Sequence, residues 1–164
     1  MSPAARQAIT VALRVMDALQ TELDALHRQI RAFAIHQPGC KALQAQYGVG
    51  PLTSTAIWAM MGDTRRFSAS RQAVRHTGLD VTVYSSDGKR APGHLAKQGP
   101  PLLRWALYEA ACLASHTRAP DHDFYASVKQ RIDHKRATIS VARKIARRSH
   151  HILRELGDKA YAAA

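Results

Sequence analysis

A heptad pattern of apolar residues runs through the first part of the chain. Every seventh position from residue 9 is apolar, and a second apolar residue follows three positions later: Ile9, Met16, Leu23 and Ile30, then Ala12, Leu19, Leu26 and Phe33. This pattern predicts a long helix with the apolar seam of a coiled coil. The helix is expected to end at Gln37-Pro38-Gly39, where proline and glycine oppose its continuation. Leu13 widens the stripe, so packing against the chain's own body is the alternative to an intermolecular or antiparallel helix contact. We predict a coiled-coil helix over residues 1–37.

The remainder, residues 38–164, predicts a compact helical domain with little or no β-structure. A short helix runs into Gly48-Val49-Gly50, and Pro51 opens a second helix that continues through Met61. This arrangement resembles a helix-hairpin-helix, in which amides at the start of the second helix hold a DNA phosphate. Gly48, Gly50 and Thr53 are therefore candidate phosphate contacts, and a plain glycine hairpin between packed helices is the alternative.

Hydrophobic patterns also predict the strand and the helices after residue 79. The alternating valines of residues 80–84 predict a strand, and residues 102–117, apolar on most faces, predict a buried helix. Residues 124–156 predict a further helical region with a break near Asp133-His134. The fold class is therefore mainly α, with a long N-terminal helix before a helical domain.

Charge is the most informative part of the composition. The chain has a formal net charge of +12, and within residues 129–154 only Asp133 opposes a run of basic side chains. A polyanionic partner is expected, nucleic acid before a membrane surface, because the large apolar residues of this segment are needed for packing. Simple excess charge is the alternative. The candidate phosphate contacts in this helical segment are Arg143, Lys144, Arg147 and Arg148.

The histidines and cysteines show no metal-ligand spacing, so no metal site is predicted. No apolar run is long enough for a membrane span or a signal peptide, and a cytoplasmic protein is expected.

Two adjacent serines, Ser85 and Ser86, stand in a loop that is rich in glycine and basic residues. A serine hydroxyl can attack a phosphodiester if it is exposed and if cations hold the phosphate. The nearby cations are Lys89, Arg90, Lys97 and Arg104. An ordinary Ser-Ser-Asp-Gly turn is the alternative, because these residues favour turns for local reasons.

A set of sequence blocks in fixed order resembles a known family. The blocks are G-V-G-P-L-T-S-T-A, M-G-D-T-R-R-F, H-T-G-L, Y-S-S-D-G-K, L-A-K-Q-G, L-L-R-W-A-L-Y-E-A-A and V-A-R-K-I-A. From Gly48 to about Leu156, the chain resembles the C-terminal domain of the insertion-sequence 110 family of bacterial transposases. The helix upstream is similar to the coiled coil that precedes this domain in the family.

The resemblance implies DNA recombination with a serine nucleophile, guided by a structured RNA. By position the nucleophile is Ser86, with Ser85 second; the family's usual next residue is glycine, and here it is Asp87. Magnesium is expected only with an N-terminal nuclease-like domain, whose four acidic residues have no counterpart before Ile9. The chain is thus expected to be the C-terminal portion of a transposase. Its implied partners are DNA, a guide RNA and a second copy of the chain.

Two other function classes remain open. A non-catalytic nucleic-acid-binding module would keep binding without cleavage, and a structural coiled-coil adaptor would show no salt-dependent binding. Whether the chain is enzymatic by itself is undecided from sequence.

Overall fold

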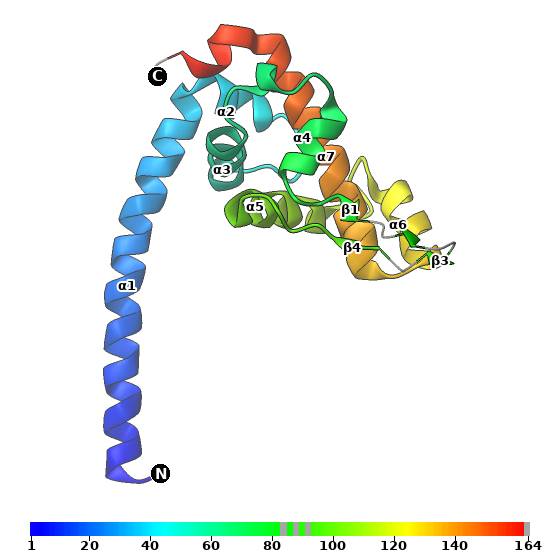
Figure 1. Ribbon diagram of the computed structural model, residues 1–164. Helices are drawn as coiled ribbons and strands as arrows, with labels where there is room; N and C mark the ends of the chain where they lie inside the picture. Colours follow the sequence, from blue (N-terminus) through cyan, green and yellow to red (C-terminus); the bar gives the residue numbers. More distant parts are fainter. Residues whose placement is uncertain (83–84, 87–88, 91–92, 163–164) are drawn as a thin grey trace.

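The computed structural model describes residues 1–82, 85–86, 89–90 and 93–162, and within 83–92 it describes no side chains. The predicted mainly α class is confirmed (Figure 1). The described helices are α1 (Pro3–His36), α2 (Pro38–Leu43), α3 (Pro51–Met61), α4 (Ser70–His76), α5 (Pro101–Cys112), α6 (His122–Arg131) and α7 (His134–Leu156), with short 3₁₀ turns η1 (Thr64–Arg66), η2 (Leu113–Ser115) and η3 (Gly157–Tyr161).

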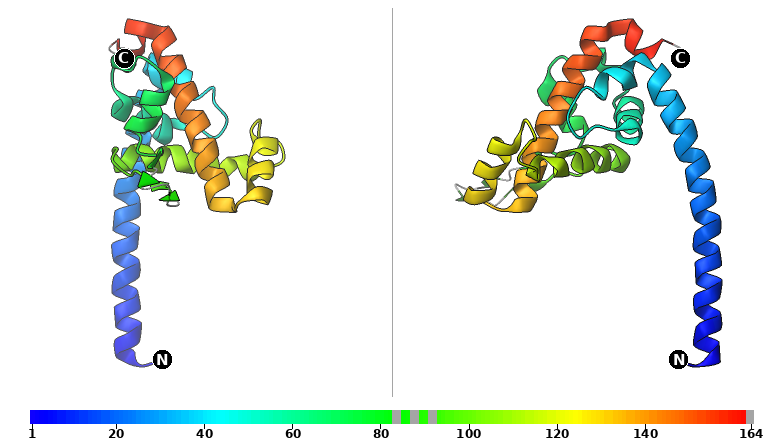
Figure 2. Two further views of the ribbon diagram at one scale, coloured as in Figure 1. Left: turned by 45° about the vertical axis from the view of Figure 1, so that its right-hand side comes forward. Right: turned by 180° about the vertical axis from the view of Figure 1, so that it is seen from behind.

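Helix α1 projects from the body as a long rod, with its N-terminus far from every other element (Figures 1 and 2). Ser2 caps it, and its last turn contacts the body, where Ala34 is buried and the ring centroids of Phe33 and Trp58 lie 5.5 Å apart. The apolar stripe from Ile9 to Leu26 is exposed. Packing of that stretch on the chain's own body is therefore not observed.

The hydrophobic core lies where α5 packs against both α3 and α7. Its largest fully buried aliphatic side chains include Ile57, Met61, Leu103, Leu107 and Leu153. Burial of each such side chain contributes about 1.5–3 kcal/mol. Alanines on α5 and α7 let the helices approach closely, and they are buried at Ala106, Ala110, Ala111, Ala142 and Ala146. This packing fixes α7 relative to the rest of the body.

The C-terminal η3 turn fastens the junction between α1 and α2. The carbonyl of Ala160 accepts hydrogen bonds from the Gln37 side-chain amide at 3.0 Å and from the Trp58 indole at 2.8 Å. A Cβ on Gly39 would lie 2.6 Å from the same carbonyl, so this position has room for glycine alone. The junction after α1 and the C-terminal turn are thus held together beside the core.

The described strands form two small antiparallel pairs. Strand β1 (Val81–Thr82) pairs with β4 (His94–Leu95), and β2 (Ser85–Ser86) pairs with β3 (Lys89–Arg90). The strand expected over 80–84 is therefore present at Val81–Thr82, and residues 83–84 lie outside the described part. The backbone register places Ser86 opposite Lys89 and Ser85 opposite Arg90, a pairing that the sequence did not predict.

The expected break in the C-terminal helical region is confirmed. Helix α6 ends at Arg131, and the Asp133 carboxylate caps α7 by accepting from the Arg136 amide at 2.8 Å. Figure 2 shows α7 running diagonally along the body, from the C-terminal turn to α6. Its faces therefore meet different elements along its length.

Candidate nucleic-acid interface

The glycine turn before α3 has a clear structural cause. Gly48 has φ +85° and lies so close to α5 that a Cβ would be 2.4 Å from the Ala110 carbonyl oxygen. The Gly50 amide donates to Thr53 Oγ1 at 2.9 Å, and the Thr53 hydroxyl lies 3.1 Å from the Gly50 carbonyl oxygen. Gly48 and Thr53 therefore shape and cap the start of α3. The amides of Leu52 and Thr53 belong to the first helical turn, where amides have no intrahelical acceptor.

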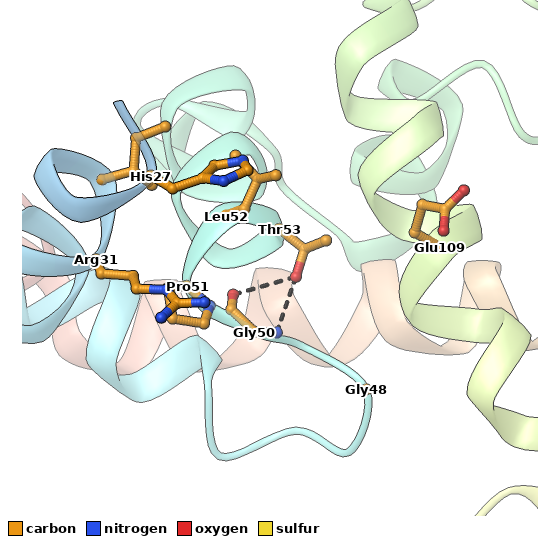
Figure 3. Close-up of a pocket in the computed structure, with 9 residues that line it drawn as sticks. His27, Arg31, Gly48, Gly50, Pro51, Leu52, Thr53 and Glu109 are labelled. Atoms are coloured by element: carbon orange, nitrogen blue, oxygen red, sulfur yellow. Dashed lines mark hydrogen bonds between the residues drawn. The ribbon is translucent and has the colours of Figure 1, made fainter. Parts of the chain in front are cut away.

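A cavity of about 360 Å³ opens beside this turn. Figure 3 shows His27 and Arg31 reaching from α1 toward the start of α3, with Glu109 on α5 across the gap. The positive end of the α3 dipole and the Arg31 guanidinium favour an anion here, whereas Glu109 opposes one. The structure thus brings Gly48, Gly50 and Thr53 together with α1 side chains that the sequence did not single out.

Two of the predicted α7 cations are ion-paired. The Lys144 ammonium lies 2.7 Å from Asp121 Oδ1 and 4.4 Å from the Phe124 ring centroid, and Arg148 donates to Asp121 Oδ2. The Asp121 side chain is 12% exposed. Burial raises the pKa of this carboxyl, but the hydrogen bonds from Lys144 and Arg148 outweigh burial and hold it below its usual value. Lys144 and Arg148 therefore fasten α7 to the turn before α6.

The other two α7 cations, Arg143 and Arg147, line a pocket of about 590 Å³ between α4 and α7. Arg71 and Arg75 of α4 line it from the other side, and Asp80 contributes its carboxylate. Arg143 is half-buried, and its Nε–H donates to the Leu79 carbonyl at 2.6 Å. Burial lowers the pKa of Arg143; the Asp80 carboxylate opposes this effect and the charge of Arg147 adds to it, and a guanidinium stays protonated at neutral pH. We call this site the arginine pocket.

The remaining predicted residues lie in β2, in β3, in the segment that leads to α5 and in α5 itself. Lys97 is exposed, with φ +53°, and its backbone amide donates to the Gly78 carbonyl at 3.0 Å. Arg104 is partly buried and donates to the Gly99 carbonyl, so it stabilises the entry into α5. The side chains of Ser85, Ser86, Lys89 and Arg90 lie outside the described part of the structure. Their roles as nucleophile and phosphate contacts stay predictions.

Family comparison decides what kind of protein this is. Residues 40–126, more than half of the chain, match the transposase family described as IS116/IS110/IS902. The chain belongs to this family. The matched residues include the glycine turn before α3, Arg71 and Arg75 of α4, and the β2–β3 pair with Ser85 and Ser86; the match ends before α7. The family resemblance seen in the sequence is thus confirmed at the level of the transposase family.

Three curated relatives agree with this assignment. The chain is 31% identical over 109 residues to a probable family 20 transposase of Pseudomonas aeruginosa, covering 63% of this chain and 32% of the relative. It is 32% identical over 105 residues to the transposase for insertion sequence element IS1111A of Coxiella burnetii, covering 60% of this chain and 29% of the relative. It is 23% identical over 128 residues to an insertion element IS116 protein of Streptomyces clavuligerus, covering 77% and 32%. This transposase-family chain thus spans about a third of the length of these relatives.

The residues that the structure describes contain neither a metal-ligand cluster nor a membrane-spanning helix. No group of three or more His, Cys, Asp or Glu side chains is placed to hold a metal ion there. No described helix combines the length and apolar composition needed to cross a bilayer.

Sequence reasoning missed the contribution of α4 to the basic surface of this transposase-family chain. A signal was present, since Arg71 and Arg75 are four residues apart and therefore share a helix face. The segment is short, however, and only the packing of α4 on α7 brings its arginines to those of α7.

Proposed function

We propose that this chain is the nucleic-acid-binding portion of an insertion-sequence transposase and acts in DNA transposition. The observation that carries the proposal is the coincidence of the family match with a net charge of +12. Neutralising DNA phosphates releases counterions, which makes cationic proteins of this kind bind DNA strongly and in a salt-dependent manner. The cavity at the start of α3 adds support, because a helix N-terminus and Arg31 face it together.

Binding to nucleic acid is tested by titrating the purified chain against duplex DNA and structured RNA over a salt series. We expect log K to fall linearly with log salt, with a slope of about −0.9 per phosphate contact on duplex DNA. The absence of salt-dependent binding by a folded sample would contradict the proposal. That result would favour the structural coiled-coil adaptor instead.

We also propose Ser86 as the nucleophile of the recombination reaction, with Ser85 as the second candidate. In this step the serine Oγ bonds to phosphorus as one P–O bond to a sugar oxygen breaks. The serine proton is lost and the departing sugar oxygen gains one, and the reverse attack rejoins the strand. Support comes from the family match, which includes both serines, and from the backbone register, which sets Ser86 opposite the basic residue Lys89. Magnesium would enter with the nuclease-like domain expected in full-length relatives.

The nucleophile assignment is tested in a complex supplied with that domain and with guide RNA. Ser86→Ala should abolish strand cleavage and the covalent protein–DNA adduct while leaving binding unchanged. Ser85→Ala is the matched control and should still cleave. If the Ser86→Ala protein cuts DNA and the Ser85→Ala protein does not, the two roles are reversed.

A non-catalytic binding module is the second candidate function. It is favoured by the basic residues of α4 and α7 that line one pocket, since they provide for binding without either serine. In that case neither serine variant changes any activity, whereas salt-dependent binding persists.

Self-association through α1 completes the proposal. The exposed apolar stripe that includes Met16, Leu19 and Leu23 would bury its surface against a second copy. Leu19→Glu combined with Leu23→Glu should reduce the mass measured by light scattering to that of one chain. An unchanged oligomer mass in this variant would contradict the role of the stripe.

A further inference from the structure

The arginine pocket concentrates positive charge from two separate helices. Arg71 and Arg75 are four residues apart on α4, and Arg143 and Arg147 are four apart on α7, so each pair shares one helix face. Because α4 packs against α7, both pairs line one cavity. Its volume of about 590 Å³ falls within the range of ligand pockets, ~300–1,000 Å³.

Charge in the pocket is unbalanced. Among the residues that the structure describes, Asp80 contributes the one carboxylate of the lining, and its contact with Arg75 is long, with 3.7 Å between Nε and Oδ2. Asp80 Oδ1 is buried and has no hydrogen-bond partner in the part of the chain that the structure describes. Four arginines line the pocket with one described carboxylate, so like charges repel one another there and an anion in the pocket would reduce that repulsion.

Arg143 is the best-positioned of the four cations. Its hydrogen bond to the Leu79 carbonyl orients the guanidinium, so little side-chain entropy remains to be lost on binding. A fixed planar guanidinium matches the geometry of phosphate oxygens and can hold two of them at once. Lys144 and Arg148, by contrast, already have a carboxylate partner.

We infer that the arginine pocket binds a phosphodiester group of a nucleic-acid strand, with Arg71 and Arg75 of α4 as contacts alongside Arg143 and Arg147. The inference rests on the proposed nucleic-acid binding and adds the residues and the place where the backbone is held. The charge of the pocket favours phosphate over a neutral ligand, and its arginines favour bidentate phosphate contacts. DNA and RNA share this chemistry.

Chain length limits the distance from the pocket to the serine hairpin, the β2–β3 pair that contains Ser85 and Ser86. Its lining residue Val81 begins β1, and Ser85 follows four residues later. Four residues span at most about 14 Å, which corresponds to about four nucleotides of helical rise along a duplex. A strand held at the pocket therefore passes within a few nucleotides of the serine backbone. The pocket would set the register of the strand at that hairpin.

Removal of the α4 charges tests this inference against a matched control. Arg71→Gln with Arg75→Gln is compared with Arg6→Gln with Arg14→Gln, which removes the same charge from exposed positions of the projecting α1. The probes are a labelled DNA duplex and an RNA duplex of the same sequence, measured by fluorescence anisotropy over a salt series. Arg71 and Arg75 are exposed, so both variants should fold, and a thermal melt checks this.

We expect the α4 variant to bind about tenfold more weakly than the control variant, with a salt slope smaller by about 1 to 2. Loss on DNA alone, or on RNA alone, would identify which strand occupies the pocket. Equal binding by the two variants, with intact wild-type binding, would overturn the arginine pocket while leaving the proposed function standing. Absence of wild-type binding would overturn both.

Removal of a negative charge from the pocket tests the inference independently, because it should strengthen binding. Asp80→Asn removes the carboxylate that opposes the arginines and should strengthen binding by about twofold to fivefold. Asp17→Asn, on the exposed surface of α1, is the control and should change binding less. Weaker binding by Asp80→Asn, in a folded sample, would count against the inference.

Discussion

Two pairs of basic residues on α7 differ in their surroundings although they are adjacent in sequence. Arg143 and Arg147 line a pocket with the arginines of α4, whereas Lys144 and Arg148 are paired with Asp121. A step of one residue turns a side chain by about 100° around a helix, so neighbouring residues meet different elements. A run of basic residues therefore does not form one uniform surface: part of it holds the fold together, and part lines a pocket with α4.

The largest effect is expected on nucleic-acid binding, when each of the two α7 pairs is mutated in turn. Arg143→Gln with Arg147→Gln should weaken nucleic-acid binding by about tenfold or more, because both residues line the arginine pocket. Lys144→Gln with Arg148→Gln removes equal charge and should weaken binding far less. Anisotropy titrations of both variants at one salt concentration measure the difference. Equal losses would mean that α7 acts as a uniform cationic surface.

The next effect concerns stability. Asp121→Asn should lower the free energy of unfolding by about 1–2 kcal/mol, because it leaves two cations without their carboxylate; the partial exposure of Lys144 and Arg148 limits the loss. Urea denaturation measures the change, and Asp123→Asn, an exposed position in the first turn of α6, is the control. A loss no greater than that of the control would show that the Asp121 cluster contributes little.

The pH dependence of that stability has a defined sign. The pKa of Asp121 is lower in the folded chain than its ordinary value, so the folded state binds protons more weakly than the unfolded state. The contribution of Asp121 is therefore complete above the ordinary pKa of about 3.9 and is lost as the pH falls through the folded value. The difference in unfolding free energy between wild type and Asp121→Asn should shrink below about pH 4. A difference that stays constant down to about pH 3 would contradict this assignment.

The smallest effect is expected at an exposed ion pair on the same helix. Arg136 and Asp133 lie 3.5 Å apart, with side chains 68% and 47% exposed. Arg136→Gln should change the unfolding free energy by less than about 0.5 kcal/mol, since solvent screens such pairs. Thermal melts of Arg136→Gln and Asp121→Asn would compare the stability lost at the exposed pair with that lost at the half-buried cluster. A larger loss at Arg136 would reverse that ranking.

Local features of the sequence predicted most of the fold. The heptads of residues 9–33 and the Pro38-Gly39 break set the extent of α1, and Pro51 marked the start of α3. These signals act within a few residues, so they can be read without knowledge of tertiary structure.

The candidate site was less predictable because it depends on distant contacts. Lys144 and Arg148 meet Asp121, and Arg143 meets Leu79, across sequence separations of more than 20 residues. The sequence periodicity of α7 does not indicate which of its basic side chains contact Asp121 or Leu79. The cap formed by Thr53 and the close approach of Gly48 to α5 likewise depend on the packed structure.

The fastening of α1 to the C-terminal turn has a consequence for the size of any assembly. Because Gln37 and Trp58 hold the Ala160 carbonyl, the helix leaves the body in a fixed direction and acts as a rigid spacer. Its 34 residues correspond to a length of about 50 Å. If two such helices pair antiparallel along their length, their bodies lie about 50 Å apart, the length of about 15 base pairs of duplex DNA. The length of α1 would then determine the distance between the two DNA segments that one assembly can hold.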